Sequence, residues 1–247
     1  MTQARYHARI AATSEDLEAV QALRYQAFIA DGGDTGHLDG RDRDAFDDRC
    51  THILVECAVD DRVVATFRLL PLGSGAEIGK SYSAQFYELH GLREFARPMV
   101  EMGRFCVAPG ETDPDILRTA WGALAAYVDR EGVEMLFGCS SFHGTDAQAY
   151  ADAFAMLRDQ HLAPKRWLPR IKAPKVFRFA QRSRRKPDRK TALKTMPPLL
   201  RSYLSLGGWV SDHAVVDPDL NTLHVFTGLE IRTIPPGRAR VLRAVAL

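Results

Sequence analysis

Apolar residues recur near the start of the chain at a spacing that is typical of helices. The stripe follows Thr13 and Ser14, either of which can cap a helix, and Glu15 and Asp16 fall in the first turn. Its apolar positions are Leu17, Val20, Leu23 and Phe28. We therefore expect a helix here, followed over 29–48 by a loop that is rich in glycine and aspartate.

Short apolar runs bounded by turn residues predict the strands. Residues 51–58 and 62–70 form a predicted hairpin around a tight turn at Asp60–Asp61, and 99–107 is a third strand. Further helices are expected at 113–132, 146–161 and 197–206, and further strands at 135–139, 213–217 and 222–228. This order of elements predicts an α/β (α+β layered) fold with a mixed sheet flanked by helices.

The length of 247 residues fits one large domain or two small ones. We expect one core at 1–164, and a basic segment plus a C-terminal helix and strand pair at 165–247 that pack on the same domain. The longest run of apolar residues plus glycine has nine residues, from 120 to 128, whereas a membrane span needs about 20. The N-terminal apolar run is too short for a signal peptide, so we expect a cytoplasmic protein.

The net charge of +2 conceals a strong asymmetry. Residues 165–194 contain 13 lysines and arginines against one acid, Asp188, so this basic segment carries a formal charge of +12 and the rest of the chain −10. Such a segment indicates an anionic partner: a membrane surface, an acidic carrier protein or nucleic acid. No RNA-binding motif accompanies it, so we expect no nucleic acid.

The four cysteines form no C-x-x-C pair and no cluster with other metal ligands. Structural zinc sites need cysteine and histidine ligands at short spacing, which this sequence lacks. We therefore expect reduced thiols and no metal.

Charged residues interrupt two of the predicted apolar strands. Arg68, Glu101 and Arg104 would be costly to bury without partners. We expect them to pair with one another or with two acidic residues ahead of the first hairpin strand, Asp44 and Asp47. The plainer interpretation is an ion network that only fixes the loop on the sheet.

Strand geometry places residues 101 and 104 on opposite faces unless a bulge intervenes. Gly103 lies between them and is a natural position for a bulge, and bulges often occur beside active sites. A bulge would bring the Glu101 and Arg104 side chains to one face.

Four sequence blocks follow one another along the chain: RYQAF at 24–28, DAFDD at 44–48, TFRLLP at 66–71 and EMGRFCV at 101–107. In this order and spacing they resemble the acyltransferases that use acyl carrier protein as donor, which have a GNAT-like fold, consisting of a mixed sheet flanked by helices, and include the N-acyl-homoserine lactone synthases. Later blocks resemble the L-ornithine Nα-acyltransferases more closely. These are FGCSSF at 137–142, PPLLRSYLSLG at 197–207 and AVVDPDLNT at 214–222.

Two departures refine the resemblance. Homoserine lactone synthases usually carry a tryptophan just after the first helix, where this chain has ADGGD at 30–34. Acetyltransferases that use coenzyme A have a glycine-rich pyrophosphate loop, and APGETD at 108–113 lacks the repeated glycines. The second departure is compatible with the 4′-phosphopantetheine arm of acyl carrier protein as donor and with no tightly bound cofactor.

The resemblance implies a mechanism. Glu101 is the expected general base for an α-amine that attacks a thioester, and backbone N–H groups near 106–107 are expected to bind the oxyanion. The expected site network is Arg24, Phe28, Asp44, Asp47, Arg68 and Arg104, in which the arginines bind the acceptor carboxylate or lock the aspartates. The expected donor-binding residues are Phe105, Cys106, Val107, Ser140 and Ser141.

The implied reaction moves a (3-hydroxy)acyl chain to the α-amine of L-ornithine and yields lyso-ornithine lipid. Alternatives are glutamine or another amino acid as acceptor, a homoserine lactone synthase, and a non-catalytic basic module that binds membranes or RNA. The acidic loop over 31–48 favours the cationic side chain of ornithine. Association with the inner face of the cytoplasmic membrane is a further expectation.

Overall fold

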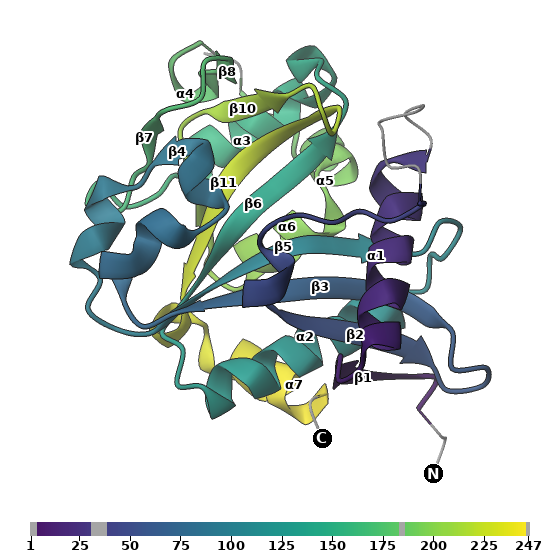
Figure 1. The fold of residues 1–247 in the computed structure, drawn as a ribbon. Coiled ribbons are helices and arrows are strands. Elements are labelled where there is room, and N and C mark those ends of the chain that lie inside the picture. The colour runs from purple at the N-terminus through teal and green to yellow at the C-terminus, as the bar shows by residue number, and fades with distance from the viewer. Residues whose placement is uncertain (1–3, 31–38, 183–185, 246–247) are drawn as a thin grey trace. The chain divides into compact units, whose positions relative to one another are not determined.

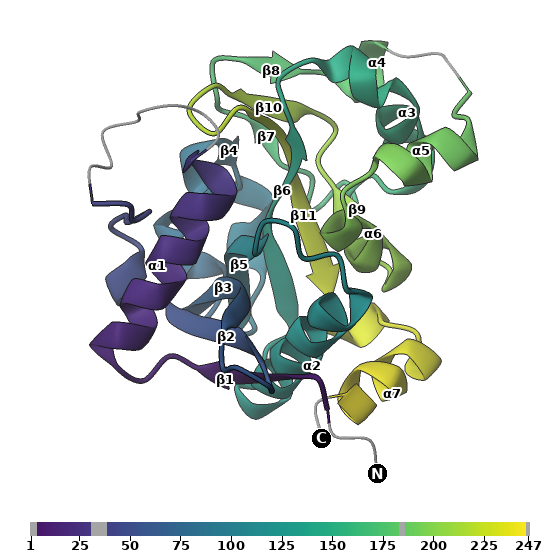
Figure 2. The same ribbon diagram turned by 90° about the vertical axis from the view of Figure 1, so that its right-hand side faces the viewer.

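The computed structural model describes residues 4–30, 39–182 and 186–245. The chain forms two compact units, each assembled from separate parts of the sequence. Figures 1 and 2 show the helices and strands from two sides. The first unit contains residues 1–71, 102–132 and 236–247, and the second contains 72–101 and 133–235. Most of the predicted acidic loop, 31–38, lies outside the described residues.

The first unit is built on the strand order β1-β2-β3-β5. These strands are β1 (Tyr6–Ile10), β2 (Thr51–Cys57), β3 (Val63–Leu72) and β5 (Met99–Val107), and the last belongs to this unit from Met102 onward. The helices are α1 (Ser14–Phe28), α2 (Pro114–Arg130) and α7 (Pro236–Val245). Figure 2 shows α1 on one side of these strands and α2 with α7 on the other.

Local sequence signals explain where these helices begin. Thr13 caps α1 in a capping box, in which its hydroxyl accepts from the Asp16 N–H and the Asp16 carboxylate accepts from the Thr13 N–H. Asp113 caps α2 by accepting from the Asp115 N–H, and Pro114 occupies the first position, where no N–H is needed. Both predicted starts are confirmed.

The second unit is built on antiparallel pairs of β6 with β11, β11 with β10, and β10 with β8, and β9 also pairs with β11. The strands are β6 (Met135–His143), β8 (Val176–Phe177), β9 (Trp209–Val210), β10 (Ala214–Asp217) and β11 (Thr222–Glu230). A separate ladder joins β4 (Tyr87–Glu88) to β7 (Arg170–Ile171). The helices are α3 (Ala151–Gln160), α4 (Phe179–Arg182), α5 (Arg189–Thr195) and α6 (Pro198–Ser205).

Two kinds of packing organise the second unit. One face of the β6–β11 ladder meets the helices in an apolar core that includes Phe142, Phe154 and Leu223. Near the end of β11, Gly228 makes room for Trp209, because a Cβ at this glycine would lie 2.4 Å from the indole carbons. The Trp209 ring stacks on Phe226, with centres 5.9 Å apart.

Several elements differ from the sequence predictions. The strand predicted at 135–139 continues to His143, and the helix predicted at 146–161 begins as a 3₁₀ turn over Ala147–Tyr150. Pattern reasoning missed β1, α7 and the 3₁₀ turns between 75 and 94. The boundary at 164 stays a prediction, and residues on both sides of it lie within the second unit.

The basic segment contributes β7, β8, α4 and α5 to the second unit. Its lysines and arginines at the described positions are exposed: 165, 166, 170, 172, 175, 178, 186, 189, 190 and 194. Within the part of the chain that the structure describes, no helix combines the length and the apolar character that crossing a bilayer requires.

Candidate active site

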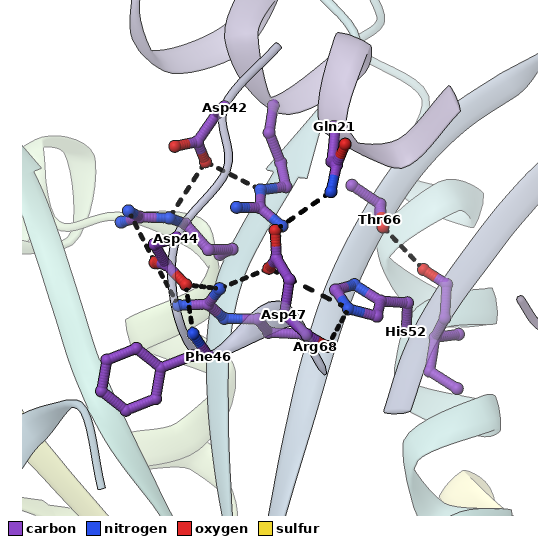
Figure 3. Close-up of polar contacts among 11 residues, drawn as sticks. Gln21, Asp42, Asp44, Phe46, Asp47, His52, Thr66 and Arg68 are labelled. Atoms are coloured by element: carbon purple, nitrogen blue, oxygen red, sulfur yellow. Dashed lines mark hydrogen bonds and ion pairs between the residues drawn. The ribbon is translucent and has the colours of Figure 1, made fainter. Parts of the chain in front are cut away.

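A cluster of arginines and aspartates lies in the first unit, where α1 meets the loop that precedes β2 (Figure 3). Arg24 on α1 donates from Nε to Asp42 Oδ2 and from Nη1 to Asp47 Oδ1, each at 2.7 Å. Gln21, one turn earlier on the same helix face, donates to the other Asp47 oxygen at 3.2 Å. With only 1% of its side chain exposed, Arg24 attaches α1 to this loop.

Arg68 on β3 provides the second guanidinium of the cluster. Its Nη1 donates to Asp44 and to Asp47, each at 2.6 Å, and its Nη2 donates to the other Asp44 oxygen at 2.7 Å. The Phe46 ring lies against the same guanidinium, 5.4 Å from ring centre to Cζ. The side chain is 4% exposed, so the predicted pairing of Arg68 with both aspartates is a buried one.

Arg104 on β5 provides the third guanidinium. Its Nε lies 3.0 Å from Asp42 Oδ2, and its Nη2 donates to Asp44 at 3.2 Å. Its backbone has a φ of +52°, which is unusual for a residue with a Cβ. The bulge expected at Gly103 stays a prediction, and the unusual φ lies at the next residue.

Three arginines and three aspartates thus neutralise one another in a largely buried cluster. Burial alone would raise the pKa of Asp44 and of Asp47, but the hydrogen bonds and charges of the arginines lower both below the ordinary value of 3.8. Burial likewise opposes the charge of Arg68, yet its two aspartates raise its pKa. Asp44, Asp47 and Arg68 are therefore ionised at neutral pH.

Sequence reasoning missed Asp42, which bridges two of the arginines. It is one of several aspartates in a loop without periodicity, so no spacing distinguishes it from its neighbours.

Arg24 Nη2 is buried and has no hydrogen-bond partner among the described residues. Of the two roles expected for the arginines, locking the aspartates is the one that their contacts display.

Glu101 lies on β5 in the second unit and is 4% exposed. Its Oε2 accepts the backbone N–H of Tyr82 at 2.7 Å, and its Oε1 accepts the backbone N–H of Ser83 at 2.7 Å and the Ser83 hydroxyl at 2.6 Å. Three donors stabilise the negatively charged form of a buried carboxylate. Sequence reasoning did not identify these partners, because they come from an irregular segment about twenty residues earlier.

The donor-binding residues predicted on β5 lie in the first unit. Cys106 is buried in an apolar cluster with Leu23, against which Phe28 packs. Burial raises the pKa of the Cys106 thiol to about 12, so it is not ionised at neutral pH and is unsuited to nucleophilic catalysis. Phe105 packs against Phe67, with ring centres 5.9 Å apart, and Val107 ends the strand half-buried.

The two serines predicted to bind the donor lie on β6 of the second unit and face opposite ways. Ser140 is buried and accepts a hydrogen bond from the Thr227 hydroxyl at 3.0 Å, whereas Ser141 is exposed. Alternation along the strand explains this difference. Only Ser141 shares the face of its neighbour Cys139, whose Sγ lies 3.4 Å from Ser83 Oγ.

Metal ligands are not gathered in either unit, as far as the described residues extend: no three histidines, cysteines or carboxylates lie together in a suitable arrangement. The carboxylates of the cluster are bound to arginines, which are poor neighbours for a cation.

Comparisons with known proteins identify the family of this chain. Residues 23–122 match the model of the Acetyltransferase (GNAT) domain. The chain is 38% identical to the L-ornithine Nα-acyltransferase of Rhodobacter capsulatus, over 89% of this chain and 88% of that protein. The chain belongs to the L-ornithine Nα-acyltransferase family. A second member, from Brucella abortus, is 31% identical over 92% of this chain and 84% of its own length.

This family member is an N-acyltransferase, as the sequence blocks predicted. Its fold is similar to that of the acyl-homoserine lactone synthase BjaI, solved with SAM and isopentyl-CoA, with a TM-score of 0.51. The two chains are 16% identical, over 97% of this chain and 88% of BjaI, so the likeness concerns the fold alone. The predicted GNAT-like mixed sheet flanked by helices is confirmed.

Proposed function

We propose that this acyltransferase moves a (3-hydroxy)acyl chain from acyl carrier protein to the α-amine of L-ornithine and so forms lyso-ornithine lipid. The observation that carries the proposal is the 38% identity, over nearly the whole chain, to a relative named for this acceptor. The charge-neutral cluster and the buried Glu101 carboxylate provide groups that the reaction needs.

The chemistry is a direct acyl transfer. The α-amine attacks the thioester carbonyl, a C–N bond forms, and the C–S bond breaks to release the phosphopantetheine thiol. Glu101 takes the amine proton, directly or through one water, while backbone N–H groups near Cys106 and Val107 bind the developing oxyanion. The un-ionised thiol of Cys106 supports a mechanism without a covalent enzyme intermediate.

The arginine–aspartate cluster serves acceptor binding in this proposal. The aspartates hold Arg24, Arg68 and Arg104 in fixed positions, and the acceptor carboxylate approaches these guanidiniums. The buried Arg24 Nη2 supports this role, because a buried donor gains from a carboxylate partner. Phe28 lies on the same helix as Arg24 and packs against the apolar cluster of Leu23 and Cys106, and we assign it to the apolar side of the site.

The donor is the 4′-phosphopantetheine arm of acyl carrier protein, and no cofactor is tightly bound. Phe105, Cys106, Val107, Ser140 and Ser141 line its path in this proposal. Ser141 is the exposed member of the serine pair, so it is the better candidate for a direct contact with the arm.

The basic segment supplies the partner surface. Its exposed lysines and arginines suit an acidic carrier protein, and they also suit the anionic inner face of the cytoplasmic membrane, into which the product must pass. We place the protein in the cytoplasm, with peripheral rather than integral attachment to that membrane.

Mass spectrometry of lipids from a heterologous host that expresses the chain tests the acceptor. A new lyso-ornithine lipid is expected, and it should be absent when Glu101→Gln is expressed at the same level. A lyso-glutamine lipid would instead identify glutamine as the acceptor. An acyl-homoserine lactone would identify the protein as a homoserine lactone synthase. If no acylated product forms from purified protein, acyl carrier protein and ornithine, the proposed reaction is wrong.

A further inference from the structure

A short segment of the second unit leads from Glu101 to a buried histidine. At one end of the segment 82–87, Tyr82 donates its backbone N–H to the Glu101 carboxylate. Near the other end, the Phe86 ring lies edge-on to the imidazole of His224, with centres 5.0 Å apart. The Tyr82 and Phe86 rings contact each other at 5.2 Å. The residue whose backbone binds the carboxylate is thus linked to the imidazole through two aromatic ring contacts.

The strand register puts the same groups on one sheet face. On the β6–β11 ladder, His224 lies opposite Ser141 and Phe226 lies opposite Cys139. Directly opposed residues, and those two positions along, share a face of an antiparallel pair. Cys139 Sγ lies 3.4 Å from Ser83 Oγ, the hydroxyl that donates to the buried carboxylate. His224 thus faces the side of the sheet on which the proposed general base is held.

The hydrogen bonds of Tyr87 determine the state of this imidazole. The phenol donates its proton to the His224 backbone carbonyl at 2.8 Å, and its oxygen lies 3.2 Å from Nδ1. Nδ1 must then carry a hydrogen, and Nε2 has a bare lone pair. Burial lowers the pKa of His224 to about 4, in keeping with a neutral ring.

Nε2 of His224 is buried and has no hydrogen-bond partner among the described residues. A buried acceptor without a partner is unfavourable, so such an atom indicates a donor that arrives from outside the chain. The rings around it are aromatic: Phe86, Tyr87 and, 5.7 Å from Tyr87, Phe226. A neutral acceptor among such rings suits an uncharged hydroxyl on an aliphatic chain better than an ammonium group, which would need a carboxylate.

We propose that His224 Nε2 accepts a hydrogen bond from the 3-hydroxyl group of the acyl donor, and that the enzyme thereby selects hydroxylated over unsubstituted acyl chains. The inference rests on the proposed function, because it assumes transfer of an acyl chain along this face. An unsubstituted chain of the same length would leave Nε2 unpaired, and sites built to bind a hydroxyl discriminate strongly against analogues that lack it.

The test compares two carrier-protein donors of equal length, with and without the 3-hydroxyl group, and ornithine as acceptor. Wild type should favour the hydroxylated donor in kcat/KM. His224→Leu should reduce that preference by about tenfold through slower use of the hydroxylated donor, with the unsubstituted donor little changed. His161→Leu, which replaces a half-buried histidine without an assigned role, should retain the wild-type preference.

Each other outcome is decisive. A folded His224→Leu with the wild-type preference overturns the proposal, as does an equal loss with both donors or a changed KM for ornithine alone. If wild type uses neither donor, the proposed function itself fails. Should His224→Leu not fold, ¹⁵N-histidine NMR of wild type replaces it: a 3-hydroxyacyl pantetheine amide should shift the Nε2 signal of His224. An equal shift with the amide that lacks the hydroxyl would contradict the proposal.

Discussion

Arg68 binds Asp44 through both terminal nitrogens, with N–O distances of 2.6 and 2.7 Å. The same Nη1 atom also reaches Asp47, which in turn binds Arg24 on α1. A strand, a loop and a helix are thereby joined through two carboxylates. Fork-to-fork geometry of this kind is strong and directional, so the cluster fixes the loop more firmly than surface ion pairs would.

Arg68→Ala should lower the free energy of unfolding by about 3–5 kcal/mol, because it removes one partner from a buried network and leaves carboxylate charge uncompensated. Urea denaturation at pH 7 measures the change. Arg118→Ala is the matched control, since its ion pair with Asp115 is exposed and should contribute less than about 1 kcal/mol. Equal stability of the two variants would contradict a structural role for the cluster.

Two substitutions at Arg104 separate its charge from its backbone. Both Arg104→Ala and Arg104→Gly lose the ion pairs, but only glycine adopts a φ of +52° without strain. Arg104→Gly should therefore be more stable than Arg104→Ala by about 1 kcal/mol, the reverse of the usual order in a strand. Thermal melts of the two variants test this, and alanine as the more stable residue would show that the positive φ carries no strain.

Glu101→Gln should lower the turnover of acyl carrier protein and ornithine by about 10²–10⁴, the usual contribution of a general base. It should also cost about 1–3 kcal/mol of stability, because an amide accepts the three donors less well than a carboxylate. Ser83→Ala is the control: it removes one donor and leaves the carboxylate in place, so activity should fall far less. Turnover of folded Glu101→Gln near the wild-type rate would remove Glu101 from the mechanism.

Stability should fall in acid through the cluster. The folded-state pKa values of Asp44 and Asp47 lie below the ordinary value of 3.8. Their stabilisation is therefore fully present above about pH 5 and is lost as the pH falls below about 4 through the folded-state values. Urea midpoints between pH 7 and pH 3 follow this loss. Asp44→Asn should be less stable at pH 7 and show a shallower decline, and an unchanged slope would exclude Asp44 as a contributor.

Neutralising the described end of the basic segment should weaken binding of anionic partners. The variant replaces four exposed residues by glutamine: Lys186, Arg189, Lys190 and Lys194. Near an anionic membrane each basic residue contributes about 1 kcal/mol, and the attraction is screened by salt. Vesicle co-sedimentation and the KM for acyl carrier protein, each at 0.05 and 0.5 M salt, should both respond. The control variant Arg118→Gln/Arg130→Gln, which removes two exposed arginines outside the segment, should change neither result. If the variant with four substitutions also changes neither result, the segment is only a solvated surface.

Local signals in the sequence predicted much of the fold because their physics is local. The Thr13 cap, the Asp113–Pro114 start and the apolar run of β5 each depend on neighbours a few residues away. The pairing of Arg68 with Asp44 was also predictable, since a charge in an apolar strand requires a partner and acidic residues lie just ahead of the first hairpin strand.

The missed parts depend on contacts between distant segments. β1 is short and half exposed, so its alternation is faint, and it forms by pairing with β2 some forty residues later. The donors to Glu101 come from backbone N–H groups at residues 82 and 83, and a backbone group leaves no mark in a sequence. Asp42 is one aspartate among several in its loop, and only the folded geometry selects it.

The space that Gly228 leaves for Trp209 gives the enzyme an optical reporter of its own. The indole is buried, stacks on Phe226, and belongs to the sheet face that also presents His224. The chain has three tryptophans, so replacing Trp121 and Trp167 by phenylalanine would leave Trp209 as the sole indole fluorophore. Its emission would then follow changes on that face during turnover without any attached dye.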